Sequence, residues 1–158
     1  SGMGALHYAI SYNQLETLNL LLGQSDINVN IRRKPLVPYG LSKRTPLMMA
    51  AISNNKDTNI QILEKLLAHE NIEVNLQDYF GSTALMCAIE SSNVEAYNKL
   101  IIREDIEVNI RDNDGITVLM LIEREFAKSD KLDFIPLLAR EDIDVNLVDN
   151  SYENTALH

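Results

Sequence analysis

The chain has 158 residues, of which 46% are hydrophobic, enough to bury a core and too apolar for a disordered acidic tail. Its 14 basic and 23 acidic residues give a formal net charge of -9, which argues against nucleic acid or an anionic membrane surface as the main partner. The single cysteine excludes an internal disulfide and a thiolate zinc site, and it fits a reducing, intracellular compartment. No apolar run approaches the roughly 18 residues that a membrane span needs.

Two short phrases alternate along the chain and define a repeat. One phrase begins with Asp or Asn followed by Ile and ends in Val-Asn, and its copies span 26–30, 71–75, 105–109 and 142–146. The other contains a leucine at positions 6, 47, 85, 119 and 157, with spacings of 41, 38, 34 and 38 residues. The shortest spacing, 34 residues, indicates a basic unit in which about 20 residues precede the Asp/Asn-Ile phrase and 14 follow it.

Each 20-residue part predicts a pair of helices. Thr45-Pro46 is a strong helix start, because the threonine hydroxyl can cap an orphan N–H and proline has no N–H to leave unsatisfied. Thr83, Thr117 and Thr155 occupy the same capping position. The second helix of each pair is predicted from apolar residues at helical spacing. These residues are Leu15, Leu18, Leu21 and Leu22; Ile60, Leu63, Leu66 and Leu67; and Val94, Tyr97, Leu100 and Ile101.

The fourth pair departs from this pattern at Pro136. If Asp133 caps a shortened helix, the proline falls in the first helical turn and is tolerated. The 14-residue part contains Asp-x-x-Gly over 78–81 and over 112–115, which predicts a turn between two short extended arms.

The Thr-Pro-Leu-x-x-Ala run over 45–50, the paired leucines and the Asp-x-Val-Asn ending, in this order, resemble the ankyrin repeat. The resemblance covers essentially the whole chain and implies an all-α solenoid of stacked helix pairs with β-hairpin or loop fingers on one side. The expected repeats span 4–36, 43–77, 81–111, 115–148 and, in part, 153–158. Since a solenoid end without a polar cap exposes an apolar face and neither end has one, we expect a fragment of a longer protein.

Two positions depart from the family pattern. Gly4 stands where the capping threonine is expected, and Ile122 takes the place of a small residue that is Ala9, Ala50 or Ala88 in the other repeats. The larger side chain of Ile122 is expected to displace the fourth helix pair.

The histidines and the cysteine favour structural roles over chemistry. The resemblance implies that His7 and His158 brace a turn by hydrogen bonding, and His69 is placed to satisfy the last carbonyls of a helix. No two histidines have metal-ligand spacing on one helix, and Cys87 has no histidine base near it in the repeat. We therefore expect no metal, no cofactor and no enzymatic activity.

In the ankyrin family, partner proteins dock on the concave face formed by the finger tips and the first helices. Carrying the family's variable positions onto this chain gives candidate contact residues in every repeat. They are Ser11 and Tyr12; Arg44, Ile52 and Ser53; Tyr79, Phe80, Ser82, Glu90 and Ser91; and Asn113, Asp114, Ile116, Arg124 and Glu125. The strongest candidates are Tyr12, Tyr39, Arg44, Tyr79, Phe80, Ser82, Glu90, Ile116 and Arg124.

The adjacent aromatics Tyr79 and Phe80 carry the most information, because aromatic side chains dominate binding hot spots. Ile116 in the next finger extends the same apolar strip. The alternative is that one of the aromatic rings folds onto the neighbouring finger and serves packing alone.

The enlarged first finger is basic. Residues 31–45 hold Arg32, Arg33, Lys34, Lys43 and Arg44 and no acidic residue, and Pro35, Pro38 and Gly40 make the segment a loop. It is predicted to hold an acidic or phosphorylated partner segment, with Tyr39 as an anchor. Two alternatives are a solvated loop and pairing with the acidic turns of the same solenoid.

We therefore expect a non-catalytic, monomeric module that binds a partner protein and neither nucleic acid nor membrane. One alternative is a regulatory or targeting module of a larger multidomain enzyme. Another is a host-directed effector of an intracellular bacterium or parasite, which would act in the host cytoplasm. The abundance of Ile and Asn favours this alternative, because it suggests an AT-rich genome.

Overall fold

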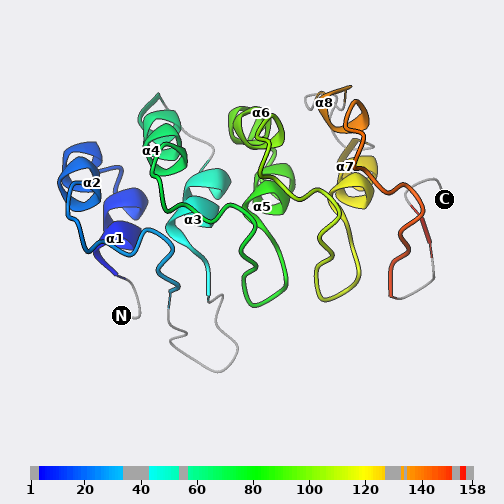
Figure 1. Cartoon of the computed structure of the whole chain (residues 1–158), viewed down its shortest axis with the longest axis horizontal. Coiled ribbons are helices and arrows are strands. Elements are labelled where there is room, and N and C mark those ends of the chain that lie inside the picture. Colours follow the sequence, from blue (N-terminus) through cyan, green and yellow to red (C-terminus); the bar gives the residue numbers. More distant parts are fainter. Residues whose placement is uncertain are drawn as a thin grey trace.

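The computed structural model shows helix pairs arranged in a row, with loops projecting to one side and the two termini at opposite ends (Figure 1). The structure describes residues 4–33, 43–53, 57–126, 133, 135–150 and 154–155, without the side chains of residues 125 and 126. The helices, in chain order, are α1 (Ala5–Ser11), α2 (Leu15–Leu22), α3 (Pro46–Ile52), α4 (Asp57–Leu67), α5 (Ala84–Glu90), α6 (Val94–Ile101), α7 (Val118–Phe126) and α8 (Ile135–Leu138). The prediction of an all-α solenoid is confirmed.

The predicted helix starts carry their caps. The Thr45 hydroxyl accepts the Met48 N–H at 3.3 Å, with Pro46 as the first residue of α3, and the Thr83 hydroxyl accepts the Met86 N–H at 3.3 Å. Thr117 makes the equivalent bond to Met120 at 3.4 Å. Each cap satisfies one of the backbone donors that a helix start leaves without an intrahelical partner.

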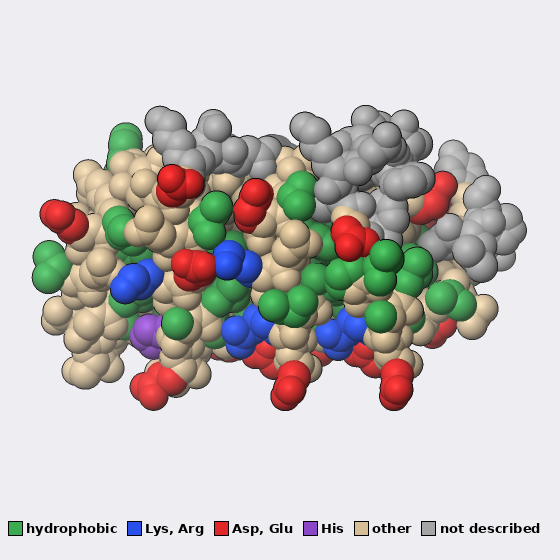
Figure 2. All heavy atoms as spheres, turned by 90° about the horizontal axis from the view of Figure 1, so that it is seen from above, with side chains coloured by type: hydrophobic (Ala, Val, Ile, Leu, Met, Phe, Trp, Pro, Cys, Tyr) green, Lys and Arg blue, Asp and Glu red, His purple; other side chains and the backbone are tan. Residues whose placement is uncertain are grey.

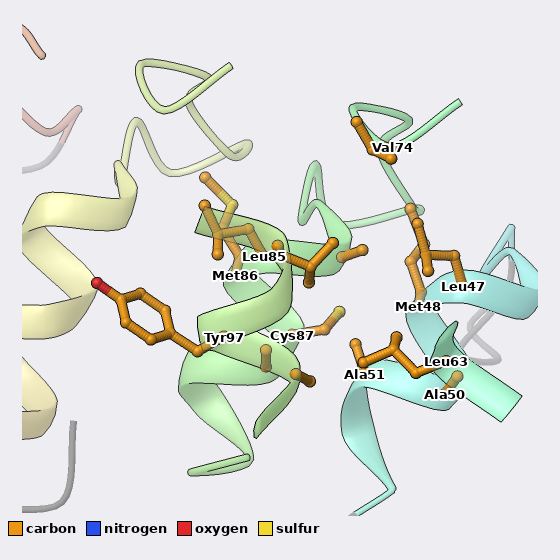
Figure 3. Packing of buried hydrophobic residues seen from close by; sticks show 14 of the residues in the cluster. Leu47, Met48, Ala50, Ala51, Leu63, Val74, Leu85, Met86, Cys87 and Tyr97 are labelled. Carbon is orange, nitrogen blue, oxygen red and sulfur yellow. The ribbon is translucent and has the colours of Figure 1, made fainter. Parts of the chain in front are cut away.

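The core lies between the helices of successive repeats. The first helices α1, α3, α5 and α7 pack in series, and α2, α4 and α6 pack against them and against one another. Small side chains such as Ala50, Ala51 and Ala88 are fully buried and allow this close approach, while Met86 and Leu100 fill the space between repeats. Figure 3 shows this packing between the α3 and α5 repeats. No repeat buries its apolar face alone, so stability comes from stacking.

The fourth helix pair is shortened as the sequence predicted. The Asp133 carboxylate accepts the Ile135 N–H at 3.0 Å, and Pro136 lies in the first turn of α8. Ile122 is buried in α7 at the position that alanine takes elsewhere. The expected displacement of this pair stays a prediction.

The fingers, defined as the segments between one second helix and the next first helix, correct the sequence analysis in one respect. None of the described residues in them forms a β-strand, although β-hairpins were one predicted form. The two arms of the finger at 76–82 are joined by the Asp78 N–H to Ser82 carbonyl bond, and the finger at 110–116 has the equivalent bond from Asp112 to Ile116. Other backbone groups of the finger at 76–82 bond to side chains or to the next finger instead of to the opposite arm: the Phe80 N–H donates to Asp78, and the Phe80 carbonyl accepts from Asn113.

A row of asparagines joins the repeats. The Asn75 side chain accepts the Glu107 N–H at 3.0 Å and donates to the Asp105 carbonyl at 2.7 Å. Asn30 makes the same pair of bonds to Glu73 and Asn71, and Asn109 makes them to Asp144 and Asp142. We call these contacts the asparagine ladder. It explains the Asn that ends the first three copies of the repeated phrase: that side chain satisfies the backbone of the following repeat.

The arginines two positions after α6 and α8 also link repeats. The guanidinium of Arg103 forms a bidentate pair with Asp105 and donates to the Leu67 carbonyl at the end of α4, and Arg140 likewise pairs with Asp142 and donates to the Ile101 carbonyl. These bonds raise the pKa of each arginine and lower that of its aspartate. Figure 2, which views the side of the second helices, shows basic side chains beside acidic ones.

His69 occupies the same repeat position as these arginines, and its predicted role was wrong. Its Nδ1 accepts the Asn71 N–H at 3.2 Å, so the ring acts there as an acceptor in the turn and makes no bond to the carbonyls of α4.

Candidate protein-binding face

The fingers and the first helices together form one face of the solenoid, which we call the inner face. Its central finger is built around Asp78. One carboxylate oxygen accepts the N–H groups of Phe80 at 2.9 Å and Ser82 at 3.0 Å, and the other lies 3.5 Å from Nε of Arg44. The Asp78 side chain is only 2% exposed. The finger is therefore shaped by a buried carboxylate that holds its backbone and pairs with the preceding finger.

The tip of this finger is fastened to the next finger. The Asn113 N–H donates to the Phe80 carbonyl, and the Asn113 side chain donates to the Tyr79 carbonyl, both at 2.9 Å. Gly81 makes this approach possible, because its φ is +83° and a Cβ there would lie 2.7 Å from the Asn113 nitrogen. The backbone that carries the two aromatic residues is thus held from both sides.

The aromatic rings themselves stay on the surface. Tyr79 is 48% exposed and Phe80 is 44% exposed, and their rings meet edge to face with centroids 5.5 Å apart. The neighbouring finger binds their carbonyls and leaves the rings half uncovered. Such a pair of exposed aromatics on a fixed backbone can contact a partner with little loss of conformational entropy.

A hollow of about 420 Å³ opens beside this pair, lined by residues of three successive fingers and of the first helices α5 and α7. Six of the nine strongest sequence candidates line it. They are Arg44, Phe80, Ser82, Glu90, Ile116 and Arg124. Asp112, Asn113 and Asp114 complete its lining. Ser82 lies deepest, at 7% exposure, and its backbone N–H and carbonyl both bond to Asp78.

The hollow mixes charge with apolar surface. Partial burial raises the pKa of Glu90; Arg124 and Arg44 lower it, while Asp112 and Asp78 raise it further. The apolar surface comes from Phe80 in one finger and Ile116 in the next. The arrangement suits recognition of a side chain with both polar and apolar parts.

Arg44 connects three repeats at one edge of this hollow. Its side chain pairs with Asp78 of the following finger, and its carbonyl accepts from the Arg33 N–H at 3.0 Å and lies 3.0 Å from Nε2 of His7. Nδ1 of His7 accepts the Gly4 N–H at 3.3 Å, so Nε2 carries the proton and donates to Arg44. His7 therefore braces a turn as the family resemblance implied, and burial lowers its pKa.

Tyr12 directly follows α1 as its C-cap residue, does not line the hollow, and is 68% exposed. Its ring stacks on Tyr8 with centroids 6.1 Å apart and an interplanar angle of 7°. Tyr8 was not among the predicted contact residues, although its spacing of four residues from Tyr12 favours contact between the two rings. The inner face thus offers a second aromatic surface in its first repeat.

The basic first finger is described only at its base. Arg32 and Lys43 are exposed, and Arg33 is joined to Lys43 and Arg44 by backbone hydrogen bonds. The predicted contributions of Lys34 and Tyr39 lie outside the described residues.

A second hollow, of about 230 Å³, follows in the next repeat and shares Ile116 and Arg124 with the first. Its other lining residues are Met120, Glu123, Asp149, Asn154 and Thr155. The sequence analysis missed Met120 and Glu123 as surface candidates and missed Asp112 in the first hollow. The repeated Asp-x-x-Gly turn was the available signal for Asp112, since the same aspartate recurs beside each groove.

The described part of the chain offers little for catalysis. Cys87 is buried in α5, and burial raises the pKa of its thiol to about 12, which keeps it protonated and unreactive. Within the described ranges, no group of three or more His, Cys, Asp or Glu side chains is arranged to hold a metal ion. No helix among the described residues has the length and apolar character needed to cross a membrane.

Comparison with known proteins agrees with the repeat pattern. The family model described as ankyrin repeats (3 copies) matches residues 6–112, more than half of the chain. The match covers α1 to α6, the first two fingers and the third finger as far as Asp112. Five of the nine residues that line the first hollow lie within it. No curated protein sequence matches the chain.

Proposed function

Because the chain belongs to the ankyrin-repeat family, whose repeats are generally protein–protein interaction modules, we propose that it is a non-catalytic module that binds a partner protein on its inner face. The observation that carries this proposal is the half-exposed pair of Tyr79 and Phe80 beside the hollow of about 420 Å³. Aromatic anchors next to a concave surface with polar walls are typical of binding hot spots.

The mechanism is display on a rigid support. Tyr79 and Phe80 sit on a turn held by the Asp78 carboxylate, and their carbonyls accept bonds from Asn113 of the next finger. Since these contacts already order the backbone, binding needs little rearrangement and loses little conformational entropy.

We further propose that the base of the first finger supplies a basic contact for an acidic or phosphorylated part of the partner. Arg32 and Lys43 are exposed, which supports this role. Arg44 contributes less charge, because its guanidinium already pairs with Asp78. The charge of the basic finger is thus best placed to steer association with a negatively charged segment.

The proposed module acts as a monomer inside the cell. The chain's one cysteine is buried in α5, where it packs as a small apolar side chain, and this fits a reducing compartment.

The test is affinity capture with the wild-type chain and with the double variant Tyr79→Ala/Phe80→Ala, followed by mass spectrometry and measurement of Kd for the captured protein. The control is Leu20→Ala/Ile102→Ala, which removes two apolar side chains that are even more exposed, from the side of the second helices. We expect the finger variant to bind at least tenfold more weakly, with an unchanged melting temperature, and the control to bind like the wild type. Equal affinity of the two double variants would overturn the site.

A further inference from the structure

We call the space between two successive fingers a groove, and two grooves of this chain differ at one position. Two positions correspond between grooves: the turn aspartate of one finger and the residue that precedes the capping threonine of the finger before it. In the first of the two grooves compared, these residues are Asp78 and Arg44, whose charged groups lie 3.5 Å apart. In the next groove they are Asp112 and Ser82. The chain therefore supplies a cation in one groove and a small neutral side chain in the equivalent place of the other.

The two aspartates are otherwise built alike. One oxygen of Asp112 accepts the N–H groups of Asp114 at 2.9 Å and Ile116 at 2.8 Å, as one oxygen of Asp78 accepts those of Phe80 and Ser82. The second oxygen of Asp78 takes the Arg44 guanidinium. In the part of the chain that the structure describes, Asp112 has no salt bridge, so the equivalent place beside its second oxygen is open.

That open place belongs to the hollow described above. Glu90 and Asp114 line it together with Asp112, which gives three acidic side chains against the two basic ones, Arg44 and Arg124. Arg44 is already paired with Asp78. The pKa of Glu90 is raised by burial and by the nearby charges of Asp112 and Asp78, in spite of the opposing effects of Arg124 and Arg44. A positive charge from outside would relieve this repulsion.

The hollow also has apolar walls. Phe80 from one finger and Ile116 from the next line the same space as the carboxylates, and Tyr79 stands against Phe80. An arginine suits this combination better than a lysine, because its planar guanidinium pairs with carboxylates in a bidentate manner and stacks on an aromatic face.

We propose that the hollow holds an arginine side chain from an extended partner segment, with a neighbouring apolar residue of that segment resting on Phe80 and Tyr79. The partner's guanidinium takes beside Asp112 the place that Arg44 takes beside Asp78, with Glu90 and Asp114 around it. This inference rests on the proposed function, since it names the chemistry of the partner at the same inner face.

The test starts with selection of random short peptides on the wild-type chain, followed by synthesis of the best binder and of its arginine-to-citrulline analogue. Citrulline keeps the shape of arginine and removes its charge. We expect enrichment of arginine next to an aliphatic or aromatic residue, and at least tenfold weaker binding of the citrulline peptide. Glu90→Gln should weaken the arginine peptide and leave the citrulline peptide unchanged, whereas the control Glu95→Gln on α6 should change neither.

A second variant tests the comparison between grooves directly. Ser82→Arg gives Asp112 the cation that Asp78 already has and should abolish binding of the arginine peptide without lowering the melting temperature. Normal binding of that peptide to a folded Ser82→Arg variant would overturn the proposal.

The outcomes separate this inference from the function on which it rests. Peptides that require Tyr79 and Phe80 but bind equally well with citrulline, or that are acidic and lack arginine, would overturn the arginine site alone. Selection of no peptide, or of peptides indifferent to Tyr79→Ala/Phe80→Ala, would overturn both proposals.

Discussion

Asn75→Ala tests how much the asparagine ladder contributes to stability. The half-buried Asn75 side chain makes two hydrogen bonds to the backbone of the next repeat, at 2.7 and 3.0 Å, and a third to the Glu107 carboxylate at 3.2 Å. A neutral hydrogen bond contributes about 1 kcal/mol net, and all three of these bonds are exposed to water, which lowers their contribution. We therefore expect the free energy of unfolding to fall by about 1–2 kcal/mol, and the melting temperature by about 2–8 °C for a chain of this size.

The assay is urea unfolding followed by circular dichroism, with linear extrapolation to water. Asn98→Ala is the matched control, because Asn98 is exposed on α6 and makes no hydrogen bond among the described contacts. Since Asn75 joins the second repeat to the third, weakening it should also broaden the transition by uncoupling the two parts of the stack. A loss below about 0.5 kcal/mol with an unchanged slope would refute the view that the ladder couples the repeats.

Three further predictions concern buried groups. Tyr97→Phe should raise the free energy of unfolding by about 1 kcal/mol in urea titrations, because the Tyr97 hydroxyl is buried without a hydrogen-bond partner among the described residues. In Figure 3 this hydroxyl points away from the other labelled side chains. Destabilisation by the substitution would show that the hydroxyl is bonded. Burial lowers the pKa of His7, so on acidification the imidazole is protonated in the unfolded chain before it is protonated in the folded one. The free energy of unfolding should therefore decrease as the pH falls below about 6.5. An NMR titration that gives folded His7 a pKa at or above about 6.5 would contradict this. Burial raises the pKa of Cys87 to about 12, so this thiol should react with a thiol reagent at pH 8 only when the chain unfolds. The labelling rate should therefore rise with added urea. Fast labelling of the native chain would be inconsistent with the burial of Cys87.

The helices were predictable because their signals are local. The cap at Thr45 and the proline after it, the cap at Thr83 and the shortened helix after Asp133 each depend on residues within one turn of the chain. The stacking was predictable because four copies of one pattern can bury their apolar faces only against one another.

Contacts between repeats were not predictable from the pattern alone. The pairing of Arg44 with Asp78 removes part of the free charge that the sequence suggested for the basic finger. The bond from Asn113 to the Tyr79 carbonyl fixes the aromatic tip, and the acceptor role of His69 follows from the turn after α4. Each depends on the spacing and orientation of neighbouring repeats, which a sequence pattern does not contain.

The candidate site was predictable as a set of positions, not as a shape. The family pattern placed Phe80, Glu90, Ile116 and Arg124 on one face, and the structure brings them around one hollow. The pattern did not separate Tyr12 from this group, although Tyr12 follows the end of α1 and stacks on Tyr8. Which positions share a hollow depends on side-chain directions across two fingers and two helices.

The central claim is that the chain binds a partner protein through the aromatic finger tip. Its most direct test is the Kd of the captured partner for Tyr79→Ala/Phe80→Ala against Leu20→Ala/Ile102→Ala, measured by isothermal titration calorimetry with melting temperatures recorded alongside. We predict at least tenfold weaker binding for the finger variant alone, with both variants melting like the wild type. Wild-type affinity of the finger variant would contradict the account.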